Sequence, residues 1–352
     1  MNIFITGGAG FLGQRLCKAL LQRGTLTDSQ GNARPIKRIR LFDVAPAVIR
    51  LLDVPPAIIH LPDMPPATIV LSDQASPAQV EAIAGDINNR DDLRRALGDN
   101  TDSVFHLAAV VSGEAEQNFE LGMRVNVDGT RALLEACRAL PKPPKFVFTS
   151  SLAVFGGPLP NPVPDSQALT PQNSYGAQKA MCELLINDMS RKGFVDGRVL
   201  RLPTITVRPG KPNKAASSFM SGIIREPLNG VDAICPVAPE LRVWVLSPRR
   251  AIHNLVLAHE LNAAQFGHTR SINVPGLCVS IGEMVQALRT VAGDAVAARV
   301  KWQRDAQIER IVASWPEAFE ATFGRALGMQ ADENFVDIVR AHIEDEFGTP
   351  DP

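Results

Sequence analysis

The sequence predicts an α/β fold, a doubly wound parallel sheet followed by a smaller C-terminal domain. Two observations lead to this prediction: short apolar runs alternate with helix-like stretches, and a glycine-rich turn joins the first run to the first helix. Alternation favours parallel strands, because each helix carries the chain back across the sheet. We expect residues 1–208 to form the first domain and 209–352 mainly the second, with part of 245–275 returning to the first.

The N-terminal segment predicts a nucleotide-binding turn. Met1 to Thr6 is apolar and rich in β-formers, which predicts a buried strand, and Gln14 to Arg23 is predicted to be a helix. Between them, Gly7 allows a tight turn, Gly10 lets the backbone approach a pyrophosphate, and Gly13 lets the helix pack closely on the strand. We therefore expect a Rossmann fold that binds a dinucleotide at the helix N-terminus.

Five further strands are predicted along the first domain. They are Ile39 to Phe42, Ala82 to Asp86, Val104 to Ala109, Lys145 to Ser150 and Val199 to Pro203. The first of these five runs into Asp43, and an acidic residue there reaches the ribose hydroxyls and favours NAD over NADP, whose extra phosphate it would repel. The polar stretch from Thr25 to Lys37 is expected to be an inserted loop, since the glycines and the acidic residue are usually about 20 residues apart.

A ten-residue unit occurs three times between residues 41 and 70. Asp43, Asp53 and Asp63 occupy equivalent positions in the three copies, so the repeat leaves open which of them meets the ribose. Asp43 is favoured because it directly follows the strand after the first helix. The copies contain prolines, which central strands exclude, so we expect a surface excursion after the second strand.

The only tyrosine of the chain, Tyr175, lies four residues before Lys179 in a helix-like stretch. This spacing places both side chains on one helix face, with Cβ atoms about 5–6 Å apart. An ammonium group can stabilise a phenolate there, and a phenolate is the base that alcohol oxidation requires. The role requires the tyrosine pKa to fall from about 10 toward neutral pH. The alternative is a surface tyrosine and lysine at a common helical spacing.

Six stretches of the chain resemble, in the same order, the extended short-chain dehydrogenase/reductases, also called the NAD-dependent epimerase/dehydratase family. They are Thr6 to Gly13, Gly85 to Ile87, His106 to Ala109, Asn126 to Thr130, Thr149 to Ser151 and the pair Tyr175 and Lys179. The resemblance implies NAD as cofactor and a smaller C-terminal substrate-binding domain. It also implies a homodimer joined through the helices around Asn118–Arg138 and Ser174–Arg191.

The resemblance also implies the roles of individual residues. Ser151, Tyr175 and Lys179 would be catalytic, with Ser151 holding the reacting oxygen. Asn126 would lie near the nicotinamide, although a polar contact inside a helix is the alternative, and His106 is interpreted as structural. The full predicted cofactor-binding set is Gly7, Gly10, Phe11, Leu12, Gly13, Asp43, Asp86, Ile87, Leu107, Ala108, Ala109, Asn126, Tyr175, Lys179 and Pro203.

Three departures from the family pattern narrow the expected reaction. Leu152 and Ala153 stand where dehydratases carry an Asp-Glu pair, so loss of water is not expected. Phe155 replaces the family's second tyrosine. Thr204 stands where sugar-nucleotide epimerases usually carry the asparagine that helps hold the nucleotide sugar, so such a substrate is disfavoured.

Four segments (110–116, 208–213, 217–219 and 224–228) are similar to a branch of the family that oxidises the C2 hydroxyl of the four-carbon sugar acid D-erythronate. A carboxylate substrate favours an arginine, and Arg208 is the first candidate and Arg225 the second, unless either is a surface charge. Ser112 follows the fourth strand, where open α/β sheets bind ligands. The alternatives are a nucleoside-diphosphate-sugar 4-epimerase and a non-catalytic NAD-sensing regulator.

The composition indicates which partners, metals and cellular compartment to expect. A net charge of −1 gives no reason to expect nucleic acid or an anionic membrane, and no apolar stretch is long enough to span a bilayer. The five cysteines and six histidines show no metal-ligand spacing, which with the absence of a secretory pattern favours a cytoplasmic protein with reduced thiols and no metal site.

In the C-terminal part, Ser280 to Glu283 predicts a capping box opening a helix through Val291. A last helix is expected to bury Phe335, Ile338, Val339 and Ile343.

Overall fold

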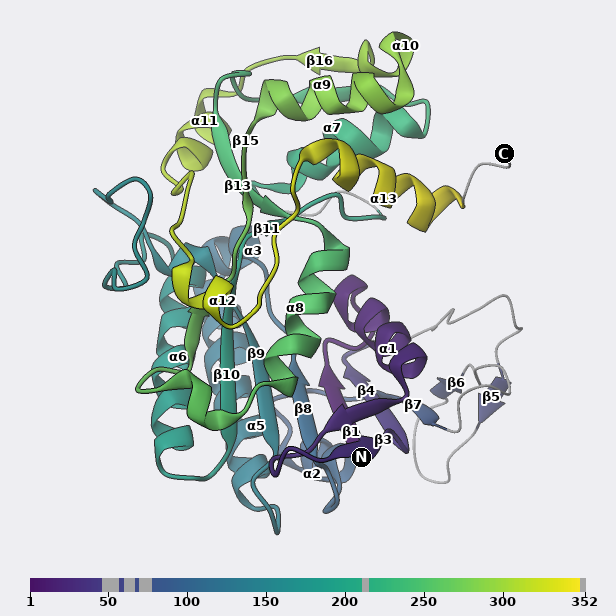
Figure 1. Cartoon of the computed structure of the whole chain (residues 1–352), viewed down its shortest axis with the longest axis vertical. Coiled ribbons are helices and arrows are strands. Elements are labelled where there is room, and N and C mark those ends of the chain that lie inside the picture. The colour runs from purple at the N-terminus through teal and green to yellow at the C-terminus, as the bar shows by residue number, and fades with distance from the viewer. Residues whose placement is uncertain (46–56, 60–66, 70–77, 211–214, 349–352) are drawn as a thin grey trace.

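A seven-stranded parallel sheet forms the larger layer of the computed structural model, which describes residues 1–45, 57–59, 67–69, 78–210 and 215–348 (Figure 1). The strands follow the order β14-β10-β9-β8-β1-β4-β7, and every neighbouring pair is parallel, as predicted. Their bounds are β1 (Asn2–Thr6), β4 (Arg38–Asp43), β7 (Gln79–Ala84), β8 (Ser103–His106), β9 (Lys145–Ser151), β10 (Asp196–Leu202) and β14 (Ser271–Asn273). The order reverses between β1 and β8, the place where open α/β sheets bind ligands.

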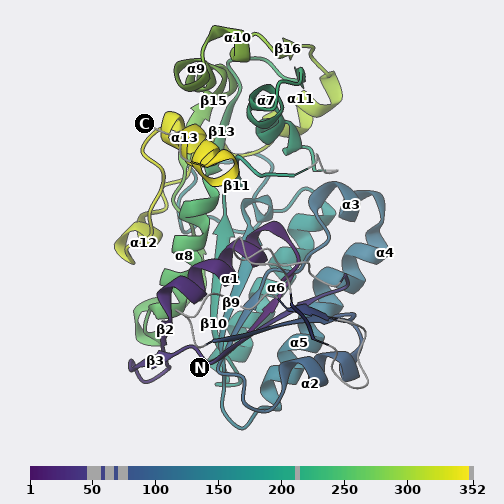
Figure 2. The ribbon, with the colours of Figure 1, turned by 90° about the vertical axis from the view of Figure 1, so that its right-hand side faces the viewer.

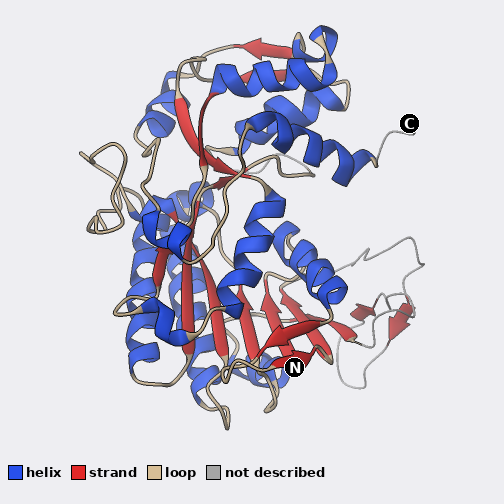
Figure 3. Ribbon diagram, in the orientation of Figure 1, coloured by secondary structure: helices blue, strands red, loops and turns tan. Residues whose placement is uncertain are grey.

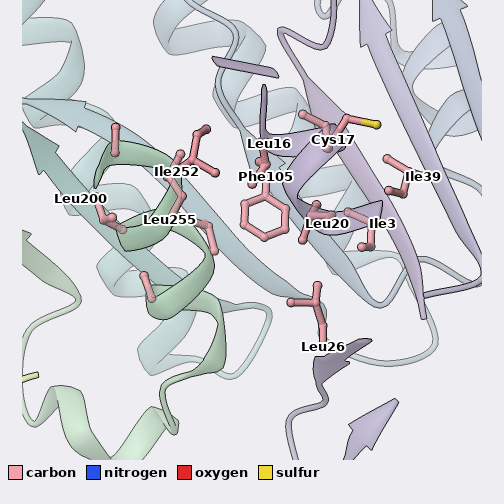
Figure 4. Packing of buried hydrophobic residues seen from close by; sticks show 14 of the residues in the cluster. Ile3, Leu16, Cys17, Leu20, Leu26, Ile39, Phe105, Leu200, Ile252 and Leu255 are labelled. Carbon is pink, nitrogen blue, oxygen red and sulfur yellow. The ribbon is translucent and has the colours of Figure 1, made fainter. Parts of the chain in front are cut away.

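Helices cover both faces of this sheet (Figure 2). One face carries α1 (Phe11–Arg23) and α8 (Pro248–Glu260), and the other carries α2 (Arg90–Leu97), α5 (Gly129–Arg138) and α6 (Ser174–Arg191). Figure 4 shows how Leu16 and Leu20 of α1 meet Ile252 and Leu255 of α8 over Phe105 of the sheet. Each such side chain contributes about 1.5–3 kcal/mol on full burial, so the packing of α8 on α1 holds a late segment against the first helix.

The predicted loop from Thr25 to Lys37 is instead an antiparallel hairpin of β2 (Thr25–Thr27) and β3 (Ala33–Pro35). The carboxylate of Asp28 accepts hydrogen bonds from the backbone N–H groups of residues 30 and 32, both at 2.9 Å, which closes the turn. The buried Lys145 Nζ donates to the carbonyls of Thr27 (2.9 Å) and His259 (2.8 Å), and Thr27 N donates to Glu260 Oε1 (3.1 Å). The hairpin is therefore fastened to the end of α8.

Several predicted boundaries differ from the structure. The first helix begins at Phe11, β7 covers Gln79–Ala84, and β10 begins at Asp196. β8 ends at His106, so the segment 107–109 lies in a loop that faces the ligand side of the sheet. The predicted strands extend too far because the loops that follow β8 and β10 also consist of small and apolar residues, which the sequence does not distinguish from strand residues.

Most of the ten-residue repeat lies outside the described residues, including Asp53 and Asp63. Two short described pieces, β5 (Ala57–Ile59) and β6 (Ala67–Ile69), pair antiparallel with each other. Neither joins the seven-stranded sheet, which agrees with the expectation that the copies are not central strands.

A smaller layer stands above the carboxyl ends of the sheet strands (Figure 3). Its strands are β11 (Thr204–Ile205), β12 (Ala233–Cys235), β13 (Arg242–Leu246), β15 (Leu277–Ser280) and β16 (Val300–Trp302). Its helices are α7 (Ser218–Leu228), α9 (Ile281–Ala292), α10 (Asp294–Ala297), α11 (Ala306–Ala313) and α13 (Phe335–Phe347). The short helix α12 (Thr322–Ala326) lies beside β14 and packs on the core of the sheet layer. The division of the chain at residue 208 stays a prediction, and α8 and β14 lie in the sheet layer.

Two local predictions for this layer are confirmed. Ser280 Oγ accepts from Glu283 N (3.1 Å) and Glu283 Oε2 accepts from Ser280 N (2.7 Å), which is the predicted capping box. On α13, the apolar stripe predicted from the sequence faces the core: Phe335, Ile338 and Val339 are buried, and Ile343 packs against them in part.

The remaining short helices are α3 (Ser112–Gln117), α4 (Phe119–Gly122), a π-helical turn η1 (Met123–Asp128), and the 3₁₀ turns η2 (Leu152–Val154) and η3 (Ala263–Phe266). In the described part of the chain, no helix has the length and apolar character needed to cross a bilayer. Over the same residues, no three His, Cys, Asp or Glu side chains gather as metal ligands. All five cysteines are free thiols, four of them buried.

Candidate active site

A cavity of about 740 Å³ opens where the sheet strands end, between the sheet and the smaller layer. Its wall contains all but one of the residues predicted from the sequence to meet the cofactor, and all those predicted to meet the substrate. They are Gly7, Gly10, Phe11, Leu12, Gly13, Asp43, Asp86, Ile87, Leu107, Ala108, Ala109, Ser112, Ser151, Tyr175, Lys179, Pro203, Arg208 and Arg225. The structure therefore brings together residues that are up to 218 positions apart, from Gly7 to Arg225.

The glycine turn forms a backbone cradle at the start of α1. Gly7 has φ +69°, and a Cβ added to it would lie 2.8 Å from Ala108 N. A Cβ on Gly13 would lie 2.3 Å from Gly7 O, so neither position has room for a side chain. The first turn of α1 carries no acidic residue and Gly10 supplies no capping side chain, which leaves its N–H groups for a ligand. This cradle fits the pyrophosphate of a dinucleotide.

The acidic end of β4 lies beside this cradle. Asp43 Oδ2 accepts from Ala9 N (3.1 Å) and Oδ1 accepts from Val44 N (2.8 Å). A carboxylate fixed in this way keeps lone pairs for ribose hydroxyls, the role predicted for it. Asp86 and the buried Ile87 line the same side of the cavity.

Asn126 is the predicted cofactor residue that is not found among the described residues lining the cavity. It lies on η1, and its side chain accepts from Val110 N (2.8 Å) and donates to Val110 O (3.1 Å) and to Gln178 Oε1 (2.7 Å). These hydrogen bonds engage the amide of Asn126 and hold the loop after β8 against α6. The surroundings of Asn126 therefore match the alternative that the sequence left open, a polar contact inside the protein.

The three predicted catalytic side chains meet at the junction of β9 and α6. Lys179 is 2% exposed, its Nζ donates to Thr149 O (2.8 Å), and it lies 5.6 Å from the centroid of the Tyr175 ring. Ser151 ends β9, and its Oγ accepts from Ala153 N (3.1 Å). A Cβ on Gly176 would lie 2.0 Å from Ala153 O, so α6 can approach η2 only because this position is glycine.

A buried ion pair that the sequence did not predict joins the elements carrying these residues. Glu183 follows Lys179 by one helical turn, and its Oε2 accepts from Arg201 Nη2 of β10 at 2.7 Å. Ser150, next to Ser151, donates to the same carboxylate. Removing one partner of a buried pair typically costs about 3–5 kcal/mol. The signal available in the sequence was an acidic residue within the apolar stretch of α6.

His106 is structural, as interpreted from the sequence. The ring is fully buried at the end of β8, with Nδ1 2.6 Å from Thr6 Oγ1 and Nε2 2.8 Å from Thr130 Oγ1. Burial, with a smaller contribution from the charge of Lys179, lowers its pKa to about 3. The imidazole is therefore neutral and ties β1 to α5 beneath the cavity.

Comparisons with known proteins agree with this geometry. The model of the NAD dependent epimerase/dehydratase family matches residues 3–250, which is more than half of the chain. The chain belongs to this family. NAD is accordingly its cofactor, and the cradle at α1, which has no room for side chains at Gly7 and Gly13, fits its pyrophosphate.

Two curated relatives carry the name D-erythronate dehydrogenase. The protein from Cupriavidus necator is 53% identical over 346 residues, 98% of each chain. The protein from Haemophilus influenzae is 44% identical over 344 residues, 98% of this chain and 99% of that one. A solved structure described as a nucleoside-diphosphate-sugar epimerase from Agrobacterium tumefaciens has a TM-score of 0.86 and 40% identity, covering 99% of this chain and 95% of that one. Together with the family, the two relatives identify an NAD-dependent dehydrogenase.

The electrostatics of this NAD-dependent enzyme differ from the sequence prediction. Burial raises the pKa of Tyr175 to about 12, and the cation that acts against this rise is Arg208. We expected a lowered pKa, with Lys179 and the oxidised nicotinamide as the sources of positive charge. Lys179 Nζ instead donates a hydrogen bond to the Thr149 carbonyl, and burial lowers the pKa of Lys179 to about 8. Desolvation of the phenol outweighs the neighbouring charge in the protein without its cofactor.

The two predicted carboxylate ligands have different surroundings. Arg225 is engaged, since Nη1 donates to Arg208 O (2.7 Å) and Nη2 donates to Glu226 Oε1 (2.6 Å). Among the described residues, no ion pair or hydrogen bond of the Arg208 guanidinium is found. Arg208 is thus the cation of this wall that is available to an anionic ligand.

Several residues on the substrate side were not predicted from the sequence. They are Asn173, Ser217, Ser218, Ser221, Arg242, Trp244 and Trp315. Ser217 and Ser218 lie in the segment 217–219, whose resemblance to the sugar-acid branch was the available signal, and Asn173 lies two residues before Tyr175. Ser221, Arg242, Trp244 and Trp315 belong to no short motif, so only the tertiary fold assigns them to the cavity.

Proposed function

We propose that this NAD-dependent enzyme oxidises the C2 hydroxyl of a small sugar acid, converting D-erythronate to 2-dehydro-D-erythronate. The observation that carries the proposal is an arginine without a partner among the described residues, Arg208, in one cavity with Ser151, Tyr175 and Lys179. The names of both curated relatives and their coverage of the whole chain support the same substrate.

Tyr175 is the proposed general base. Its phenolate takes the proton of the substrate hydroxyl, Ser151 hydrogen-bonds the reacting oxygen, and the adjacent carbon loses a hydride, leaving a ketone. NAD supplies the hydride acceptor and a positive charge. That charge and Arg208 both favour the phenolate over the phenol, against the effect of burial. Lys179 assists from the same helix face.

The carboxylate of the substrate is the proposed ligand of Arg208. A guanidinium can donate two parallel hydrogen bonds to a carboxylate, which orients the acid as well as binding it. The bonds that Arg225 already makes support Arg208 as the first choice. Ser112 at the start of α3 is proposed to contact the substrate hydroxyls.

A nucleoside-diphosphate-sugar 4-epimerase is the rival, because the similar solved structure is described as a nucleoside-diphosphate-sugar epimerase. Thr204, which lines the cavity where sugar-nucleotide epimerases usually carry an asparagine, argues against it. The purified protein with NAD and a panel of four- to six-carbon sugar acids should accumulate NADH with D-erythronate. Turnover of a UDP-sugar without NADH would establish the epimerase instead, and NAD binding without turnover of any substrate would favour a sensor.

We also propose a homodimer in the cytoplasm. Phe119 of α4 and Met181 and Leu184 of α6 are 54%, 41% and 67% exposed, on the helices that the family resemblance predicts to pair. Burying them against a second copy would remove this apolar surface from water. Light scattering should give twice the chain mass of 38.0 kDa, and Leu184→Glu should give the monomer.

A further inference from the structure

Arg208 lies in a segment that no regular element holds in place. It follows β11 and precedes α7, so neither a sheet ladder nor a helix fixes its backbone. The position of its guanidinium nevertheless decides where a carboxylate can sit relative to Tyr175. Misplacement by about 1 Å can reduce a rate 10²-fold, so a fixed backbone at this residue matters to the reaction.

Helix α7 supplies the missing support through two side chains. Ser221 Oγ accepts a hydrogen bond from Arg208 N (3.0 Å), and Arg225 Nη1 donates to Arg208 O (2.7 Å). Ser221 and Arg225 are four residues apart and therefore lie on the same face of the helix. Together they hold the peptide groups on both sides of the Arg208 Cα.

Ser221 and Arg225 are themselves fixed. Ser221 is 2% exposed and its Oγ lies 3.3 Å from Thr206 Oγ1, while Arg225 is 7% exposed and is paired with Glu226. The same helix buries Met220, Ile223 and Ile224 in the core of the smaller layer. The backbone of Arg208 is thus anchored to a packed helix, whereas its guanidinium has no partner in the part of the chain that the structure describes.

We propose that Ser221 and Arg225 are positioning residues that clamp the backbone of Arg208 and so set the place of the substrate carboxylate. This inference rests on the proposed role of Arg208. The clamp acts through Arg208 without itself taking part in proton or hydride transfer. Its loss should weaken binding of the acid more than it slows the chemical step.

A double-mutant cycle tests the clamp. Ser221→Ala should raise KM for D-erythronate about five- to tenfold, as expected for one lost hydrogen bond that positions a ligand, with kcat changed less than about twofold and KM for NAD unchanged. In an Arg208→Ala background, the same Ser221→Ala change should have no further effect on KM. Ser221→Thr, which keeps the hydroxyl, should restore a value near that of the native enzyme.

Ser190→Ala is the matched control. Ser190 is also a buried serine with two hydrogen bonds, donating to Ile186 O (2.6 Å) and accepting from Gly197 N (3.1 Å), but it lies on α6 outside the cavity lining. It should lower thermal stability without changing either KM. If Ser221→Ala does not fold, Arg225→Lys replaces it in the cycle, with the same expectation.

The outcomes separate the two proposals. An equal rise in KM from Ser221→Ala in both backgrounds would overturn the clamp, because the serine would then act independently of Arg208. If Arg208→Ala alone leaves KM for D-erythronate unchanged, the carboxylate role of Arg208 fails, and the clamp fails with it. A rise in KM from Ser221→Ala alone that disappears in the Arg208→Ala background supports both, whereas no rise from Ser221→Ala alone overturns the clamp.

Discussion

The two halves of the cavity are built in different ways. In the cofactor half, the part that meets the pyrophosphate is made of backbone: a cradle of glycines, two alanines after β8 and the N–H groups that open α1. The substrate half is made of side chains from α3, β9, β11, α7 and β13. A backbone cradle requires residues without side chains at fixed spacing, whereas a wall of side chains can be built from many residue types. A motif therefore reveals the first half of a site, and only the fold reveals the second.

Tyr175 lies where the two halves meet, and its loss should have the largest effect. Tyr175→Phe should reduce kcat by about 10²–10⁴, because the general base is removed while the ring remains. NAD binding, followed by calorimetry, should stay unchanged. A variant that retains more than a tenth of the activity would contradict the mechanism.

Because the chain has only one tyrosine, the same residue can be titrated directly by its phenolate absorbance. The free protein should ionise at a pKa of about 12, and Tyr175→Phe should abolish the signal. Adding NAD should move the transition to lower pH, since its positive charge favours the phenolate.

Gly13→Ala tests the cofactor half. The new Cβ would lie 2.3 Å from Gly7 O, a backbone atom that cannot move aside without opening the cradle. Overpacking of this kind costs about 1–3 kcal/mol, so we expect NAD to bind about tenfold more weakly or worse. Gly222→Ala on α7 is the control, because its Cβ would meet no atom closer than 3.6 Å. Equal affinities for NAD in the two variants would contradict the view that the cofactor half depends on residues without side chains.

Arg208→Lys tests the substrate half with a smaller expected effect. Lysine keeps the charge but loses the paired hydrogen bonds, so KM for the acid should rise about fivefold with kcat little changed. Arg242→Lys makes the same change in an arginine of the cavity wall that is already bonded to Cys278 (Nε–Sγ 3.3 Å). Its kinetics should stay within about twofold of the native values. A larger KM effect at Arg242 than at Arg208 would show that the proposal assigns the carboxylate to the wrong arginine.

His106 affects the stability of the fold and not the kinetics of either half. Its pKa is about 3 in the folded protein and near 6.5 when unfolded, so between these values the unfolded chain binds a proton that the folded protein does not. Stability is therefore lost as pH falls from about 6.5 toward 3, by up to about 1.4 kcal/mol per pH unit. His106→Gln should flatten this slope in urea unfolding, whereas the exposed His268→Gln should not.

The sequence predicted the parallel sheet, the glycine turn and the set of residues that the cavity brings together. Those features depend on short stretches whose residue types follow from local backbone geometry. It did not predict the hairpin at Thr25–Pro35, because a few polar residues around Asp28 can close a turn or remain a loop. The Glu183–Arg201 pair and the place of Asn126 depended on contacts between elements far apart in the chain.

The fastening of the hairpin to α8 has a consequence for how the protein is made. Thr27 depends on Glu260, which is 233 residues further along the chain. At typical synthesis rates of about 5–20 residues per second, the hairpin emerges from the ribosome on the order of 10–50 s before its anchor. The nucleotide-binding layer therefore cannot complete itself as the first half of the chain appears. A chain truncated after residue 208 should leave the N-terminal core open and available to chaperones or proteases.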